Sequence, residues 1–110
     1  MIHVTYDDHA VTFVITFLLK PGCGQAFLDL LAPVLDAMRH EPTFIDAVLH
    51  RDPENPSRFM LYETWAGLQE VVEVQVHRGY RDSFWTGLPE LLAEDRRIEV
   101  WNPIRGDFAR

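Results

Sequence analysis

The stretch Arg51–Trp65, RDPENPSRFMLYETW, combines a turn with a strand and organises the rest of the chain. Its DPENPS segment has the Asp, Pro, Asn and Ser composition of a turn. The residues after it alternate, and one face of the expected strand over Arg58–Trp65 carries Phe59, Leu61, Glu63 and Trp65. An apolar face with a carboxylate either lines a pocket or belongs to an ordinary core, and both interpretations stay open.

The segments before this hairpin predict two strands and a helix. Val, Ile, Phe and Thr dominate Ala10–Leu19, which favours a strand with both faces at least partly covered. Apolar residues at helical spacing then predict a helix over about 25–40, in which Pro33 causes a kink or a later start. A strand over Phe44–Arg51 leads into the turn.

The segments after Trp65 predict a broken helix and a last strand. Helical pieces over about 68–77 and 81–93 meet near Gly79, and RRIEVWNPI then alternates until Pro103 ends the strand. The expected order is therefore β-α-β-β-α-β. Right-handed crossovers make this an α+β, ferredoxin-like split βαβ fold, an antiparallel sheet with both helices on one face. We expect one domain over residues 10–104, a loose lead-in at 1–9 and a tail at 105–110.

The composition excludes several functional classes. The chain of 110 residues has a net charge of −7, which argues against nucleic acid and anionic membranes, because both require a basic face. Its longest uncharged apolar run, AVTFVITFLL, is too short to cross a bilayer as a helix, and MIHVTYDDHA does not resemble a signal peptide. The single cysteine, Cys23, fits a reducing compartment. We therefore expect a cytoplasmic protein.

The first strand predicts a partner for the sheet. Its residues are apolar on both sides, whereas the two helices cover only one face. A second copy of the chain is the simplest cover for the other face. We therefore expect a homodimer, with His50 and Tyr62 directed towards the partner subunit.

The pattern spread over Val11–Trp101 resembles the antibiotic biosynthesis monooxygenase-like superfamily of small dimeric α+β barrel proteins. Its parts are LLKPG at a strand end, QAFLDLL at a helix start, EPTF, and the most specific piece, HRDPENPSRFMLYETW; LPELLAED resembles the end of the family's second long helix. The resemblance implies a homodimer with facing sheets and a pocket between sheet and helices. Some relatives oxygenate anthrone-type polyketides or quinols without metal, flavin or haem, and others degrade haem.

The chain departs from the family pattern at identifiable positions. Many members carry a His early in the second helical region and another a few residues later, where this chain has Val74 and Gly79. His77 lies between these positions and matches neither. Haem-degrading relatives use an Asn in the first strand, which this chain lacks, so a haem oxygenase is not indicated.

The resemblance implies a cofactor-independent monooxygenase that acts on a phenolic, quinol or polyketide-like aromatic. Such an enzyme needs an apolar pocket, a group that ionises the substrate, and exclusion of water. The alternative is a non-catalytic dimeric barrel that binds a small apolar ligand, and an isomerase or decarboxylase of the same architecture also stays open. We expect no metal and no organic cofactor, because neither a metal-ligand spacing nor a nucleotide-binding motif is present.

Two residues are predicted to be catalytic. The indole N–H of Trp65 orients a substrate oxygen or, alternatively, Trp65 plugs the strand end. His77 acts as a base near neutral pH or, alternatively, is a solvated surface residue. Four side chains are predicted to bind the substrate: Phe59, Leu61, Tyr80 and Phe84. Tyr80 and Phe84 share a helical face and, alternatively, pack against the sheet.

Three further residues near the expected pocket, Glu63, Trp85 and Cys23, are assigned roles from the sequence. An unpaired buried charge is costly, so Glu63 is expected to form an ion pair with Arg51 or Arg58 near the same hairpin or, alternatively, to act as a catalytic base. Trp85 is expected to point away from the pocket, towards the dimer contact. Cys23 lies close to a helix start but has no base beside it by sequence spacing, so a nucleophilic role is not indicated.

Overall fold

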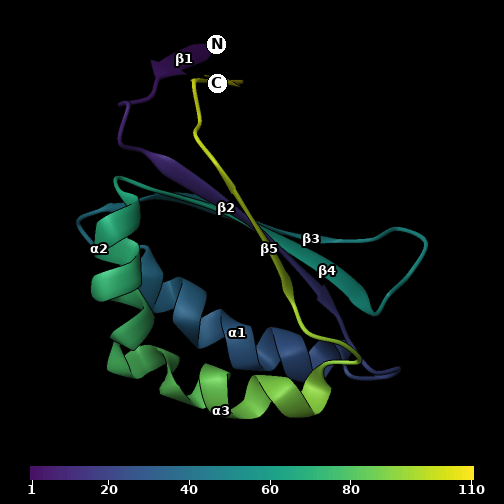
Figure 1. Cartoon of the computed structure of the whole chain (residues 1–110). Helices are drawn as coiled ribbons and strands as arrows, with labels where there is room; N and C mark the ends of the chain where they lie inside the picture. The colour runs from purple at the N-terminus through teal and green to yellow at the C-terminus, as the bar shows by residue number, and fades with distance from the viewer.

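A four-stranded antiparallel sheet forms the centre of the computed structural model, which describes residues 1–110 (Figure 1). The strands are β2 (Val11–Leu18), β3 (Phe44–Arg51), β4 (Arg58–Trp65) and β5 (Arg97–Trp101), and they lie in the order β3-β4-β2-β5. The helices cover one face of this sheet. The predicted ferredoxin-like α+β fold is therefore confirmed.

The helices occupy the predicted segments. Helix α1 (Gly24–Met38) follows a turn in which Gly22 has a φ of 80°, a left-handed conformation that favours glycine. It continues through Pro33, so the later start is not observed. The second region is broken as expected, into α2 (Leu68–Glu73), the 3₁₀ turns η1 (Gln75–His77) and η2 (Gly79–Arg81), and α3 (Asp82–Leu91). No helix is both long and apolar enough to cross a membrane.

The core lies between the sheet and the two long helices. Strands β2 and β4 pair from Val11↔Trp65 to Leu18↔Arg58, so their alternate residues share the face that the helices cover. Fourteen buried residues form this core. Its centre is a cluster of four aromatic rings from β2, α1, β4 and α3: Phe17, Phe27, Phe59 and Phe84.

The two ends of the chain form a second, smaller sheet. Strands β1 (Ile2–Thr5) and β6 (Arg105–Phe108) pair antiparallel, and the ribbon stands away from the main sheet (Figure 1). The expectation of a loose lead-in at 1–9 was therefore wrong, and the tail at 105–110 also contains a strand. Each strand has only four residues and finds its partner at the opposite end of the sequence, so local patterning carries almost no signal for it.

Candidate functional site

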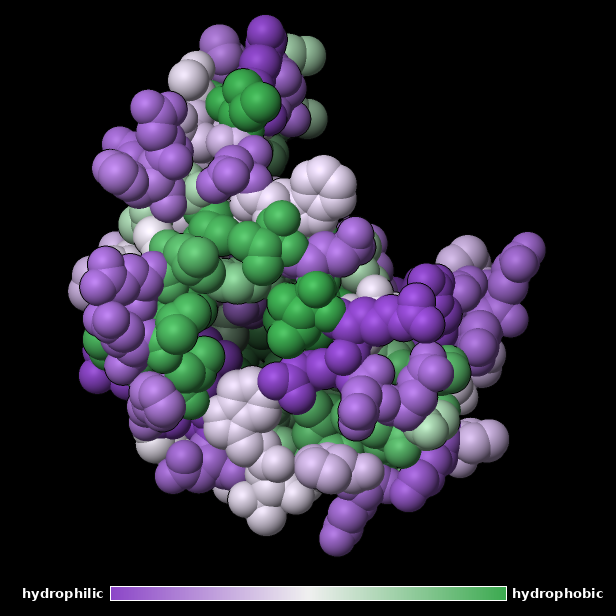
Figure 2. Space-filling model, in the orientation of Figure 1, coloured by the Kyte–Doolittle hydropathy of each residue, from purple (hydrophilic) through white to green (hydrophobic).

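A cavity of about 220 Å³ lies between the helix-covered face of the sheet and the helices. Of its 16 lining residues, 13 are hydrophobic, and they come from β2, β4 and β5 as well as from α1 to α3. The remaining three are Glu63, Arg81 and Arg96. Figure 2 shows a hollow bordered largely by hydrophobic residues. The cavity is thus an apolar container with a small number of charged groups, as small-molecule sites typically are.

The cavity opens beside the edge strand β5. Ile98 faces the helix side of the sheet, because it pairs with Ile15 of β2, yet it is half exposed. Val72 of α2 also lines the cavity and is more than half exposed. We define the mouth of the cavity by its exposed lining residues Val72, Arg96 and Ile98, together with Trp85, which is partly exposed.

A buried carboxyl group, that of Glu63, lies at the inner end. Glu63 shares a face of β4 with Leu61 and Trp65 and is only 6% exposed. The indole Nε1–H of Trp65 donates a hydrogen bond to its Oε1 at 3.2 Å. Burial raises the pKa of Glu63, while the charge of Arg81 and the hydrogen bond from Trp65 lower it in part. Glu63 is therefore positioned as a proton acceptor whose pKa is above that of an exposed Glu.

Arg81 is the second charged group at the inner end, and its Nε has no hydrogen-bond partner. The residue is 7% exposed, and this nitrogen is buried. None of the four ion pairs in the structure includes Arg81. Its Cζ lies 5.5 Å from the ring centroid of Tyr80 and 6.0 Å from that of Trp65. Buried cations are normally paired, so this guanidinium is suited to bind an anionic group in the cavity.

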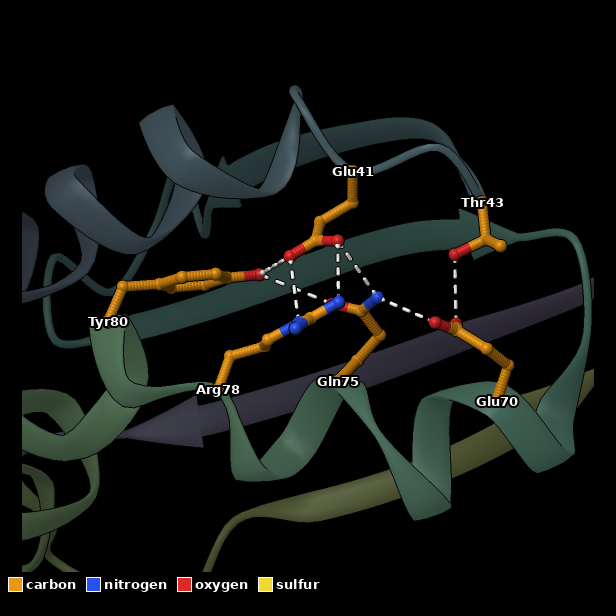
Figure 3. Close-up of polar contacts among 6 residues, drawn as sticks. All are labelled: Glu41, Thr43, Glu70, Gln75, Arg78 and Tyr80. Atoms are coloured by element: carbon orange, nitrogen blue, oxygen red, sulfur yellow. Dashed lines mark hydrogen bonds and ion pairs between the residues drawn. The ribbon is translucent and has the colours of Figure 1, made fainter.

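A polar network holds the segment that carries Arg81. It joins the α1–β3 loop to the region from α2 to η2 through six residues: Glu41, Thr43, Glu70, Gln75, Arg78 and Tyr80 (Figure 3). Gln75, which is fully buried, donates to Glu41 at 3.2 Å and to Glu70 at 2.8 Å. Tyr80 donates to Glu41 at 3.2 Å. Because Tyr80 precedes Arg81, the network fixes the backbone from which Arg81 enters the cavity.

Trp85 lies at the mouth, which corrects the expectation that it points away from the pocket. It extends from the first turns of α3, and its Nε1–H donates to the backbone oxygen of Val76 at 3.1 Å. The guanidinium carbon of Arg96 lies 5.0 Å from the centroid of its ring. Trp85 therefore forms part of the wall and supports Arg96.

Neither of the two residues predicted to be catalytic, Trp65 and His77, lines the cavity. Trp65 is completely buried, and its N–H is used by Glu63. Its contact with the site is this hydrogen bond to the carboxyl group of Glu63. His77 is exposed in η1 and is not among the lining residues.

Two of the four predicted binding residues line the cavity. Leu61 and Phe84 contribute to its wall. Phe59 instead packs in the aromatic core, and Tyr80 belongs to the polar network. Strand alternation places Phe59 and Leu61 on the same face of β4. It does not show which of the two packs against other side chains in the core and which borders the cavity.

The expected ion pair of Glu63 was wrong. Arg58 pairs with Asp52 at 3.3 Å within the hairpin turn, and Arg51 is exposed. The cation that acts on Glu63 is Arg81, which no local argument links to it. A signal was nevertheless present, because Arg81 stands on the same helical face as Phe84, Trp85 and Leu88 in the run RDSFWTGL.

Comparisons with known proteins agree on one family. The family model described as Antibiotic biosynthesis monooxygenase matches residues 10–71. A protein of Pestalotiopsis microspora named “Putative monooxygenase” is 28% identical over 99 residues, covering 89% of this chain and 82% of the relative.

Solved structures show the same fold. A conserved protein from Methanosarcina mazei has a TM-score of 0.78 at 20% identity, with 86% of this chain and 93% of that chain covered. SnoaB from Streptomyces nogalater, described as a cofactor-independent oxygenase, has a TM-score of 0.74 at 18% identity, with 88% and 94% covered. Because the family model spans more than half of the sequence, the chain belongs to the antibiotic biosynthesis monooxygenase family.

Proposed function

We propose that the chain is a cofactor-independent monooxygenase whose substrate is a small phenolic, quinol or polyketide-like aromatic. One observation carries the proposal: an apolar cavity holds, at its inner end, a buried carboxyl group and a buried arginine whose Nε has no hydrogen-bond partner. The apolar walls suit a flat ring. Glu63 and Arg81 suit a hydroxyl group that must lose its proton.

Proton transfer at the inner end keeps the local charge constant. The Glu63 carboxylate takes the proton of the substrate hydroxyl and becomes neutral, while the substrate becomes a phenolate beside Arg81. A single negative charge thus stays next to the guanidinium before and after the step. Burial raises the pKa of Glu63 towards that of the phenol, and Arg81 stabilises the phenolate, so both effects favour the transfer.

The oxygenation step then needs only dioxygen. The phenolate passes one electron to O₂, and the two radicals combine to form a carbon–oxygen bond and a peroxide anion. Neutral Glu63 protonates the peroxide, and its carboxylate then removes the proton from the same ring carbon. The O–O bond breaks, a carbonyl forms, and the released hydroxide takes that proton from Glu63. One oxygen atom enters the product, the other leaves as water, and the carboxylate is regenerated.

The cavity volume favours a small substrate. Sites for drug-sized ligands typically measure about 300–1,000 Å³. The cavity of about 220 Å³ lies below this range. It therefore suits one or two fused rings better than a tetracyclic polyketide.

Oxygen consumption tests the proposal. Uptake and product mass would be measured with hydroquinones, naphthols and anthrones for wild type, Glu63→Gln and His77→Ala. A Gln at position 63 still accepts the hydrogen bond from Trp65 but cannot take the proton, so we expect a loss of about 10²–10⁴-fold. His77→Ala, outside the cavity, should retain activity and serves as the control.

Two outcomes would decide against this function. Full activity of Glu63→Gln would remove Glu63 from the chemistry. Absence of uptake over the panel, together with a panel member that raises the melting temperature, would instead support the non-catalytic ligand-binding barrel.

We also propose a homodimer formed through the sheet face that lacks helices. Val48 on β3 faces this side, because it pairs with Tyr62, and it is 48% exposed. Trp101 on β5 pairs with Thr12 on the same side and is 57% exposed. Such apolar exposure favours a second copy. Light scattering should give twice the monomer mass, and Val48→Glu should reduce it; a wild-type monomer at micromolar concentration would contradict the proposal.

A further inference from the structure

Arg96 at the mouth of the cavity has no acidic partner. It belongs to the turn before β5 and follows Glu94 and Asp95 directly, yet none of the four ion pairs in the structure includes it. Its guanidinium instead lies over the ring of Trp85, with 5.0 Å between Cζ and the ring centroid. The cation is therefore held beside the opening without being neutralised.

The support of Arg96 is itself fixed. The hydrogen bond from Trp85 to the backbone of Val76 holds the indole ring in the wall of the cavity. A guanidinium that stacks on an aromatic ring contacts it with its face and keeps the N–H groups at its edge available. Two such N–H groups bind the two oxygens of a carboxylate in a planar arrangement.

The charge of the cavity is opposite to that of the whole protein. The chain has 17 acidic and 10 basic residues, but the cavity is lined by two arginines and one glutamate. In the proposed function, Arg81 stabilises the phenolate oxygen that forms in the reaction. The charge of Arg96 remains available for a second anionic group, one that is ionised before the reaction begins.

We propose that Arg96, held on Trp85, binds a carboxylate of the substrate, so that the substrate is a hydroxylated aromatic carboxylic acid. The hydroxyl group enters first and reaches Glu63 and Arg81, and the carboxylate stays at the mouth. This orientation is the favourable one, because a carboxylate at the exposed mouth keeps part of its hydration, whereas at the buried end it would lose it. The inference rests on the proposed function in one respect: the hydroxyl group is placed at the inner end because it reacts there with Glu63 and Arg81.

The experiment compares two probes that differ only in charge. They are a hydroxynaphthoic acid whose hydroxyl and carboxyl groups lie at opposite ends, and its carboxamide. Calorimetric binding under anaerobic conditions excludes turnover. Wild type is expected to bind the acid about tenfold or more tightly than the carboxamide, as a charge-assisted, bidentate contact would give.

Matched variants isolate Arg96. Arg96→Gln should abolish the preference for the acid and leave the affinity for the carboxamide unchanged, while Arg96→Lys should keep part of the preference. Arg97→Gln removes the same charge one residue later on the other side of the sheet, where Arg97 pairs with Thr16, and should keep the full preference.

The results separate this inference from the proposed function. Equal affinity of wild type for both probes, including binding of neither, contradicts the carboxylate site even if oxygen uptake is found with neutral phenols. An unchanged preference in Arg96→Gln contradicts it as well. A preference that is lost in Arg96→Gln and kept in Arg97→Gln supports it even if no oxygen is consumed.

Discussion

The segment from η1 to η2 contributes to two polar clusters, the network around Gln75 and the inner end of the cavity at Arg81. The two clusters differ in whether their buried hydrogen-bonding groups have partners. Gln75 is fully buried, and its amide nitrogen donates to both Glu41 and Glu70. Arg81 is almost as buried, but its Nε has no partner. A buried polar group with its partners stabilises the fold, whereas a buried cation without one destabilises it unless a ligand is bound. The first cluster is therefore structural, and the second is expected to be functional.

Replacement of Arg81 is expected to give the largest loss of activity without a matching loss of stability. Arg81→Met keeps the length of the side chain and removes the charge that stabilises the phenolate, so oxygen uptake should fall by about 10²–10³-fold. The free energy of unfolding should change little, because the desolvation cost of the buried guanidinium is lost together with its attraction to the Glu63 carboxylate. Uptake assays and urea unfolding measure the two effects.

The matched control is Arg78→Met. Arg78 contacts Glu41 of the network at 3.2 Å and does not line the cavity. Gln75 and Tyr80 still donate to Glu41 when Arg78 is lost, so the segment should stay in place and uptake should change little. If Arg81→Met instead destabilised the protein by several kcal/mol, Arg81 would belong to the structural cluster, and the comparison would fail.

Replacement of Gln75 should have the opposite result. Gln75→Leu keeps the volume but removes the donors to Glu41 and Glu70, so we expect a loss of about 2–3 kcal/mol in the free energy of unfolding. Thr43→Val removes only the 2.8 Å hydrogen bond to Glu70, and about 1 kcal/mol is expected. Equal stability of Gln75→Leu and wild type in urea would show that the network does not hold this segment.

The pH dependence of stability gives the smallest and most specific test. Burial raises the pKa of Glu63, so the folded state binds this proton more tightly than the unfolded state does. The resulting stabilisation is complete below the unfolded pKa of about 4.3 and is lost as the pH rises through the higher folded value. Glu63→Gln lacks this loss, so its stability relative to wild type should increase as the pH rises above the unfolded pKa. A difference that does not change with pH would contradict a raised pKa.

The sequence was most informative where local signals agree. Strands β3 and β4 have the predicted limits, because alternating apolar residues are bounded by a turn rich in proline. The break in the second helical region lies near Gly79, as predicted. These features depend on residues that are neighbours in the chain.

The missed features depend on residues that are distant in the chain. The terminal ribbon pairs Ile2 with Phe108, and the inner end of the cavity brings Arg81 of η2 to Glu63 of β4. The position of Trp85 in the cavity wall depends on how α3 packs against the sheet. Side-chain filling decides which residues of an apolar face are core and which line a cavity, and one sequence does not contain that information.

The three tryptophans of the chain lie in three different surroundings. Trp65 is completely buried, Trp85 is part of the cavity wall, and Trp101 is exposed on the face without helices. The intrinsic fluorescence of the protein therefore contains three separate reporters. Single-tryptophan variants would read unfolding from Trp65, ligand entry from Trp85 and subunit association from Trp101, without any added dye.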